Sequence, residues 1–559
     1  MENFEKLIKG GYYYVDKSLL IKDILTLSGE IKLITRPRRF GKTLAMDMMK
    51  SFFSVDEKED LFAGLKIKNE KKIIKEHYHR YPVIYVSFKS VKESTWERAY
   101  DSFKNLLAKL AKDAKKYAKD DHDKIYLEKI INKQATKSEY ESFLWSISKM
   151  AYEKTGVMPI ILIDEYDVPI ESAYVNRHKD PDYYDNMIDF MRAFLTFALK
   201  GSDTYFSFAI LTGVYRIAKE SIFSGLNNLV IYSIFDQRLS DKYGFTEDEI
   251  VEMIEYYNLT DEDKKMIDGW YGNYRIGNME NLYNPWSVVN YIATRIETSL
   301  PPEEAVDTYW INTSSNDIII SQLENNERVK EKLDKLIEGK DVVENLNPNL
   351  SLREIDRAKS GVWVLFANAG YLAAKRLSRR EYSLKIPNEE ILEFFKDSVQ
   401  MWIERKDGYS PSEMYTSLKE MLTRGKYENF KKQLKEFILT GFSFFDVAKD
   451  ESERFYKGFL LGLLSVAING FKVESEMESG YGRLDVVVYP RDKRYGQYAA
   501  IFEVKKADNE SRLEVKAKEA LKQIKERKYY AKMKSLGYEV IGFGIAFCRK
   551  KVEIKTQAL

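Results

Sequence analysis

Short apolar runs alternate with amphipathic stretches over the first 236 residues, and this alternation constrains the fold of the 559-residue chain more than any other feature. The runs are Glu30–Thr35, Pro82–Phe88, Pro159–Asp164 and Tyr205–Thr212. Strands that are apolar at nearly every position are typically buried on both faces. The alternation therefore predicts an α/β fold, in which helices cover both sides of a parallel sheet.

The pattern changes twice further along the chain. After Asp236 helical patterns dominate, and one helix begins with a capping box formed by Thr246 and Glu249. From about residue 453 the order becomes helix, strand, strand, helix and strand, with one long charged helix expected over 510–536. We therefore predict three domains, at residues 1–236, at the mostly helical residues 237–445, and at 446–559.

The overall charge does not point to a partner. The chain has 89 basic and 87 acidic side chains, so any surface that binds nucleic acid must be a local patch. Its one cysteine, Cys548, allows neither an internal disulfide nor a cysteine-based zinc site. Signal-peptide patterns and apolar runs of about 18 residues are absent from the sequence, so we expect a cytoplasmic protein without a membrane partner. The sequence leaves open whether the protein forms a homo-oligomer.

The first apolar run leads into a loop with the residues of a phosphate-binding site. The loop ends in Gly41, Lys42 and Thr43, where a helical pattern begins. In a Walker A loop, backbone N–H groups hold phosphate, the lysine contacts the β- and γ-phosphates, and the threonine hydroxyl binds magnesium. We expect Lys42 in such a loop, facing solvent. Arg36 stands where the general motif begins with glycine, so a basic turn that opens a helix is the alternative.

Two acids end the third apolar run, as in a Walker B strand. Asp164 would hold the magnesium ion of ATP, and Glu165 would polarise the attacking water. Thr212, at the tip of the next strand, is the candidate sensor of the γ-phosphate. The alternative is that these residues only solvate the strand ends. Both motifs in one α/β block predict ATP and Mg²⁺ as cofactors.

These stretches resemble a known family, the AAA-ATPase-like proteins of bacteria, over residues 1–402. The resemblance is carried by RPRRFGKTL, IDEYDVPI, LTGVYRIAKESIFSGLNNL, WYGNYRIG and LYNPWSVVNYI. It implies a P-loop NTPase sheet of the AAA/STAND-like branch, followed by a mostly helical, winged-helix-like region. In that family RPRRFGK stands in for the Walker A loop, so Arg36 departs only from the general motif.

Eight residues form the predicted nucleotide site. They are Arg36, Arg38, Arg39, Gly41, Lys42, Thr43, Asp164 and Thr212. Thr43 and Asp164 would be the magnesium ligands among them. Arg38, Arg39 and Arg216 stay alternatives for the arginine that stabilises the transferred charge.

Near the C-terminus, three charged residues lie within otherwise apolar strands. Asp485 lies in one strand, and Glu503 and Lys505 lie two residues apart in the next, on one face. The two carboxylates and the carbonyl of Val504 form an all-oxygen ligand set suited to Mg²⁺, and Lys505 would position the attacking water. This is the D…ExK arrangement of the PD-(D/E)xK nucleases. It also arises by chance in a chain that is 31% charged.

Flanking residues extend this motif. Glu453 would be a further metal ligand, and Gln523 and Tyr529 form a QxxxxxY pattern in the following helix. ERFYKGFLLGLL, ESGYGRLDVVVYP, FEVKKA and ALKQIKERKYY resemble the PD-(D/E)xK module found behind AAA-ATPase-like domains. The resemblance implies a restriction-endonuclease-like α/β domain. Asp485, Glu503, Lys505, Gln523 and Tyr529 are therefore candidate catalytic residues, together with Glu165 in the ATPase domain.

Three functions are compatible with these motifs. In the first, ATP gates a magnesium-dependent nuclease that cuts nucleic acid, with DNA favoured over RNA, and defence against foreign DNA or mobile elements is inferred only by analogy. In the second, the protein is an ATP-switched binding protein whose nuclease-fold module is catalytically inactive. In the third, the protein is an ATPase with an unrelated α/β appendage. Only the first predicts metal-dependent cleavage that requires Asp485, Glu503 and Lys505.

Overall fold

The computed structural model divides the chain into two compact units. The first contains residues 1–321 and 343–391, and the second contains residues 322–342 and 392–559. The residues that the structure describes are 2–200, 204–216, 223, 228–311, 317–325, 327–337, 339–348, 350, 352–355, 358, 360–407, 411–441, 460, 464, 471–475, 477–480, 482–548 and 551–559.

A five-stranded sheet with parallel pairing organises the first unit. Its strand order is β2-β3-β4-β1-β5. The strands are β1 (Ile31–Thr35), β2 (Val83–Ser87), β3 (Ile160–Asp164), β4 (Ala209–Gly213) and β5 (Leu229–Tyr232). Every residue of β1, β3 and β4 is buried, as their continuous apolar runs predict. The edge strand β5 was not among the strands predicted from the sequence, and three of its four residues are only partly buried.

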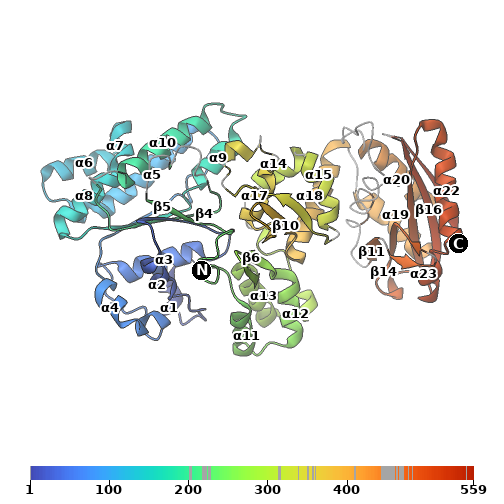
Figure 1. Ribbon diagram of the computed structural model, residues 1–559, viewed down its shortest axis with the longest axis horizontal. Coiled ribbons are helices and arrows are strands. Elements are labelled where there is room, and N and C mark those ends of the chain that lie inside the picture. Colours follow the sequence, from blue (N-terminus) through green and yellow to red (C-terminus); the bar gives the residue numbers. More distant parts are fainter. Residues whose placement is uncertain are drawn as a thin grey trace. The chain divides into compact units, whose positions relative to one another are not determined.

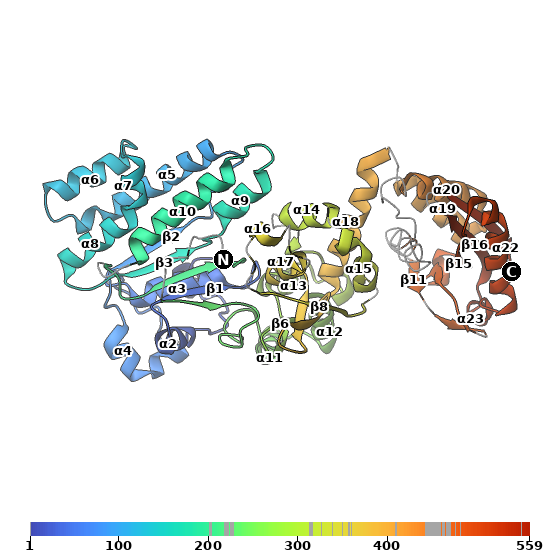
Figure 2. The same cartoon turned by 45° about the horizontal axis from the view of Figure 1, so that its top comes forward.

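Helices cover both faces of this sheet, which confirms the predicted architecture (Figures 1 and 2). One face carries α1 (Phe4–Lys9), α2 (Leu20–Thr26), α3 (Lys42–Phe53) and α4 (Lys71–His77). The other face carries α5 (Trp96–Ala114), α6 (Asp121–Ile131), α7 (Lys137–Glu141), α8 (Phe143–Thr155), α9 (Val168–Asn176) and α10 (Tyr183–Leu199). On the α3 side, Met46, Met49 and Phe52 pack against the sheet in one apolar core.

The remainder of the first unit is mostly helical, with two small sheets. Its helices are α11 (Glu247–Tyr256), α12 (Asp261–Tyr271), α13 (Pro285–Thr298), α16 (Leu352–Ile355) and α17 (Gly361–Ala369). The small sheets are the hairpin β6 (Tyr274–Ile276) with β7 (Met279–Leu282), and the group β8 (Val342–Asn345), β10 (Glu381–Lys385) and β9 (Ala373–Arg376). The expected capping box is present at α11, where Thr246 and Glu249 bind each other's backbone N–H groups.

A second five-stranded sheet organises the other unit, in the order β11-β14-β15-β16-β17. Its strands are β11 (Phe471–Ser475), β14 (Val486–Pro490), β15 (Tyr498–Lys506), β16 (Glu539–Cys548) and β17 (Lys551–Ala558). β15 and β16 are parallel, and the other pairs are antiparallel. The two edge strands escaped the sequence analysis, because they alternate polar and apolar residues and form no apolar run.

Helices lie on both faces of this sheet as well (Figure 1). α19 (Pro411–Arg424) and α20 (Glu428–Gly441) pack against the face that carries Phe502 and Phe543. On the other face, α22 (Leu513–Glu526) lies so close to β16 that a Cβ at Gly544 would be 2.3 Å from the carbonyl oxygen of Ala517. α14 (Asp317–Asn325), α15 (Glu327–Ile337) and α18 (Glu389–Asp407) complete the long helices of the described residues.

The single helix predicted over 510–536 is wrong in one respect, because the helix is interrupted. α22 ends at Glu526, and a second helix, α23, spans Ala531–Ser535. Lys528 has a φ of 52°, in the left-handed region. The N–H of Tyr529 then donates to the carbonyl of Ile524, and that of Lys528 donates to Lys525. These two bonds form a Schellman motif, which ends the helix.

Among the described helices, none is both long and apolar enough to cross a lipid bilayer.

Candidate active sites

The loop between β1 and α3 has the shape of a phosphate-binding turn. Arg39 and Gly41 have left-handed backbones, with φ of 65° and 82°. Gly41 caps α3, and a Cβ there would meet no atom, so glycine is favoured by its backbone conformation and not by crowding. α3 begins at Lys42 immediately after this turn. Its first N–H groups and the positive end of its dipole therefore favour an anion at this point.

Lys42 lies folded back over this loop. Its ammonium donates to the carbonyl oxygens of Arg36, at 3.1 Å, and Pro37, at 2.8 Å. The expectation that Lys42 faces solvent is wrong, since only 7% of the residue is exposed. Burial lowers the pKa of Lys42 to about 8, and the carboxylates of Asp167, Glu165 and Asp164 oppose this shift. The ammonium is thus held among groups that keep it charged at neutral pH.

The three loop arginines have different surroundings. The buried guanidinium of Arg36 donates to the carbonyl oxygens of Thr35, Tyr232, Arg238 and Leu239, and it stacks on Tyr243. Burial lowers its pKa to about 10. These bonds join the end of β1 to the segment after β5, so this geometry favours a structural role for Arg36 over the expected nucleotide contact.

Arg38 and Arg39 have acidic partners. Arg38 forms an ion pair with Glu171 of α9. Arg39 lies 4.2 Å above the ring of Trp286 and 3.8 Å from a carboxylate oxygen of Glu2. Arg216 is half-buried and lies three residues after the end of β4. The choice among the three as the charge-stabilising arginine stays open.

The acidic tip of β3 lies next to this loop in the sheet. β4 lies between β1 and β3, so Thr212 at its end stands between the loop and the acids. The Thr212 hydroxyl donates to Oδ1 of Asp164 at 2.5 Å, and both residues are fully buried. Thr212 therefore orients the carboxylate that is predicted to hold magnesium.

Glu165 is held in an unusual conformation. Its φ is 54°, which costs a residue other than glycine about 1–3 kcal/mol and is common at functional sites. Burial, and then the neighbouring Asp164, raise the pKa of Glu165 to about 7. A carboxyl group that exchanges its proton near neutral pH suits a general base.

The sequence analysis missed Asp167, which is part of the same cluster. Its Oδ2 accepts hydrogen bonds from the N–H groups of Val214, at 2.7 Å, and Tyr215, at 2.8 Å. Burial raises its pKa to about 6, although these donors oppose the shift. Asp167 thus ties the start of α9 to the chain beyond Thr212. The available signal was a third acid three residues after Asp164 in IDEYD.

A second candidate site lies in the other sheet. β14 pairs with β15 so that Val486 faces Phe502, and the same register places Asp485 opposite Glu503. Oδ2 of Asp485 accepts a hydrogen bond from the N–H of Val504 at 2.8 Å. Both carboxylates are nearly inaccessible, at 6% and 2% exposure. The structure thus brings together the two acids of the predicted metal site.

Lys505 and Gln523 surround Glu503. The ammonium of Lys505 lies 3.7 Å from Oε1 of Glu503, so it acts as a counter-ion to this carboxylate. The side-chain amide of Gln523 on α22 donates to the same oxygen. It also lies 3.2 Å from the hydroxyl of Tyr529. The left-handed turn at Lys528 is what returns Tyr529 to Gln523.

The other two predicted metal ligands are Val504 and Glu453. The side chain of Val504 lies in the core on the opposite face, with Phe502 and Phe543, so only its carbonyl is a candidate ligand. Glu453 lies outside the residues that the structure describes. The carboxylates of Asp485 and Glu503 suit a hard divalent cation, because magnesium prefers oxygen ligands.

Comparison with known families agrees with this geometry. Residues 1–223 match the family model of the predicted AAA-ATPases, and residues 451–557 match that of the PD-(D/E)XK nuclease superfamily. The chain therefore joins an AAA-ATPase-like domain to a PD-(D/E)XK nuclease superfamily domain, as the resemblance implied. These families support an ATPase and a nuclease.

One relative is similar over nearly the whole length. The chain is 25% identical to an uncharacterized protein in the vnfD 5′ region of Azotobacter chroococcum mcd 1. The similarity spans 98% of this chain and 96% of that protein, so both domains and the region between them are shared.

Proposed function

We propose that the protein binds and hydrolyses ATP with magnesium, and that this reaction controls a magnesium-dependent nuclease that cleaves DNA. The observation that supports the nuclease proposal is the register of β14 and β15, which places the buried Asp485 opposite the buried Glu503, with the Lys505 ammonium 3.7 Å from Glu503. Two carboxylates exposed by 6% or less repel each other unless a cation lies between them. A metal site accounts for their placement better than a packing role does.

In the nuclease site, each residue has a role that follows from its position. Asp485 and Glu503 would hold the metal ion, which supplies a charge that lowers the pKa of bound water and stabilises the phosphorane. Lys505 would leave Glu503 and move its ammonium to the attacked phosphate. Gln523 would keep Glu503 oriented through its amide. Attack by water would form a new bond from oxygen to phosphorus and break the bond to the leaving oxygen, and the proton that the water loses would balance the proton that the leaving oxygen takes up.

In the ATPase site, the loop before α3, Lys42 and Thr43 would bind the phosphates and magnesium. Glu165 would take the proton of the attacking water, because its raised pKa of about 7 suits a base at neutral pH. Thr212 would report the γ-phosphate through its bond to Asp164. Defence against foreign DNA or mobile elements is a process that this pairing of activities suits by analogy.

The decisive experiment incubates the purified full-length protein with single-stranded DNA, duplex DNA and RNA, each with and without ATP and Mg²⁺. We expect magnesium-dependent cleavage of DNA that changes with ATP. Nucleotide binding without cleavage of any substrate would instead support an ATP-switched binding protein with an inactive module. An absence of both nucleotide and nucleic-acid binding would reject both proposals.

A further inference from the structure

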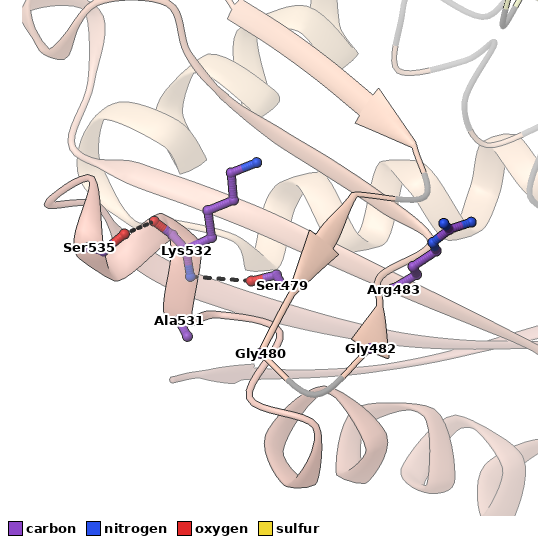
Figure 3. Close-up of a pocket in the computed structure, with 7 residues that line it drawn as sticks. All are labelled: Ser479, Gly480, Gly482, Arg483, Ala531, Lys532 and Ser535. Atoms are coloured by element: carbon purple, nitrogen blue, oxygen red, sulfur yellow. Dashed lines mark hydrogen bonds between the residues drawn. The ribbon is translucent and has the colours of Figure 1, made fainter.

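An open hollow of about 770 Å³ lies between a short hairpin and a short helix of the nuclease-like domain (Figure 3). One wall is the short hairpin formed by β12 (Glu478–Ser479) and β13 (Gly482–Arg483), and the other is α23. Its described lining residues are Ser479, Gly480, Gly482, Arg483, Ala531, Lys532 and Ser535.

The hairpin is fixed against α23 by polar contacts and by glycine. The Ser479 hydroxyl donates to the carbonyl of Tyr529 at 2.7 Å and accepts from the N–H of Lys532 at 3.2 Å. Gly480 has a φ of 59°, and a Cβ there would lie 2.1 Å from the carbonyl oxygen of Arg527. Only glycine fits this approach, so the hollow is a built feature of the fold.

The hairpin wall of the hollow lies against Tyr529, which is hydrogen-bonded to the residues of the proposed nuclease site. A Cβ on Gly482 would lie 3.3 Å from the hydroxyl of Tyr529. That hydroxyl is bound to Gln523, and Gln523 donates to Glu503. Along the chain, Arg483 precedes Asp485 by only two residues. A ligand that reaches from the hollow towards these residues would therefore meet the proposed metal site.

The charged side chains among the described lining residues are cations. Arg483 and Lys532 extend from the two walls, and both are exposed (Figure 3). Among the described residues, no carboxylate lies within ion-pair distance of the Lys532 ammonium. Glu474 is close enough to Lys532 to interact with it electrostatically, but it is bound to Lys472, at 2.5 Å, and to the hydroxyl of Tyr489. The described part of the hollow therefore attracts anions.

We propose that this hollow binds the sugar–phosphate backbone of DNA next to the phosphodiester that is cut. The proposal rests on the proposed nuclease function and adds where its substrate lies. Two cations on facing walls, with glycines that let a backbone approach closely, suit successive phosphates. The chain as a whole has a net charge of only +2, so such a local patch is needed for binding. Contacts of this kind position DNA without reading its sequence.

The test measures DNA binding in the full-length protein made cleavage-deficient by Asp485→Asn. Fluorescence anisotropy gives the Kd of a labelled 30-base-pair duplex as salt is varied, for Lys532→Ala and for Arg483→Ala/Lys532→Ala. Each lost phosphate contact lowers the slope of log K against log salt by about 0.9, which is roughly fivefold in Kd at 0.15 M salt. We therefore expect the double variant to bind more than tenfold more weakly.

Lys432→Ala is the matched control. Lys432 is an exposed lysine on α20, which packs against the opposite face of the same sheet, so its loss should leave Kd and slope unchanged. Thermal unfolding checks that each variant is folded. If the double variant binds DNA with the unaltered Kd and slope, the proposal is wrong. The proposal is also wrong if the protein binds an RNA of the same sequence more tightly than the DNA, and if the substitutions weaken the binding of that RNA and leave DNA binding unchanged.

Failure of the nuclease proposal gives a different result. In that case the protein with native Asp485 cleaves no DNA, but the Lys532→Ala and Arg483→Ala/Lys532→Ala substitutions in the hollow still weaken its binding to DNA. If the native protein cleaves DNA and the hollow variants cleave and bind as well as it does, only the hollow proposal fails.

Discussion

The hydroxyl of Thr212 lies 2.5 Å from Oδ1 of Asp164, and this hydrogen bond joins the tips of two adjacent parallel strands. The two residues are 48 positions apart in the chain and are both fully buried. The orientation of the proposed magnesium ligand therefore depends on a side chain from another strand. Any movement of Thr212 on nucleotide binding would reach Asp164 directly.

Replacing Thr212 by Val should slow ATP hydrolysis and lower stability. The change keeps the shape but removes the donor to a buried carboxylate, which costs about 1–3 kcal/mol. Steady-state ATPase rates and denaturant unfolding measure the two effects. Thr35→Val is the matched control, because the buried hydroxyl of Thr35 has no hydrogen-bond partner among the described residues. An equal effect of both variants would show that the bond to Asp164 is unimportant.

Replacing Lys42 by Met should lower ATP hydrolysis by orders of magnitude. Met fills the space of the buried lysine but carries no charge for the phosphates. In the native protein, ATP affinity should fall as the pH rises through about 8, because Lys42 then loses its proton. Steady-state ATPase assays measure the first effect, and titration calorimetry between pH 7 and pH 9 measures the second. The variant should lack this dependence on pH, and native turnover in it would reject the assignment.

Replacing Glu165 by Gln should preserve ATP binding and stop hydrolysis. In the native protein the rate should rise with pH through about 7, as the carboxyl group loses its proton. The pKa of Glu165 in the folded protein lies above the ordinary value of 4.5. The stability that its protonated form contributes is therefore lost as the pH rises from 4.5 through about 7. The variant should therefore be more stable than the native protein at pH 8.

This difference in stability should vanish near pH 4, where Glu165 is protonated in both states. Thermal unfolding at the two pH values provides the comparison. Loss of ATP binding together with hydrolysis would mean that Glu165 is a direct ligand or a structural residue instead of the base.

Two substitutions of Asp485 should separate its chemical and structural roles. Asn retains an oxygen that can accept from the N–H of Val504, so Asp485→Asn should fold normally but bind no magnesium and cleave no DNA. Ala leaves that buried N–H without its partner, so Asp485→Ala should in addition lose about 1–3 kcal/mol of stability. Magnesium titration, unfolding and cleavage assays measure the three effects. Cleavage by Asp485→Asn at the native rate would overturn the nuclease proposal.

Replacing Tyr529 by Phe should reduce cleavage about tenfold or more, without abolishing it. Its hydroxyl lies 3.2 Å from the amide of Gln523, which orients Glu503, and such indirect partners of a metal ligand usually contribute 10–100-fold. The magnesium dependence of the rate should shift to higher concentration. Tyr530→Phe removes a neighbouring, half-buried hydroxyl and serves as control. A purely structural Tyr529 would change stability and leave the magnesium dependence unaltered.

The sequence by itself determined the features that depend on local pattern. Continuous apolar runs placed β1, β3 and β4 in a buried parallel sheet. The two-residue spacing of Glu503 and Lys505 placed both on one face of β15, and Thr246 with Glu249 marked the start of α11. These features need only neighbouring residues, because strand and helix periodicity and helix capping are local properties.

Only the tertiary structure decided the features that depend on contacts between distant residues. The bonds from Arg36 to Tyr232 and Leu239 span about 200 positions, and they favour a role in tying the loop to the sheet over the predicted nucleotide contact. The burial of Lys42 and the hydrogen bond that Asp167 accepts from the N–H of Val214 also depend on contacts between distant residues. Spacing along a chain does not specify which distant carbonyl or N–H a side chain will reach. Packing of strands and helices around a shared core selects those partners, because buried polar groups must find hydrogen bonds there.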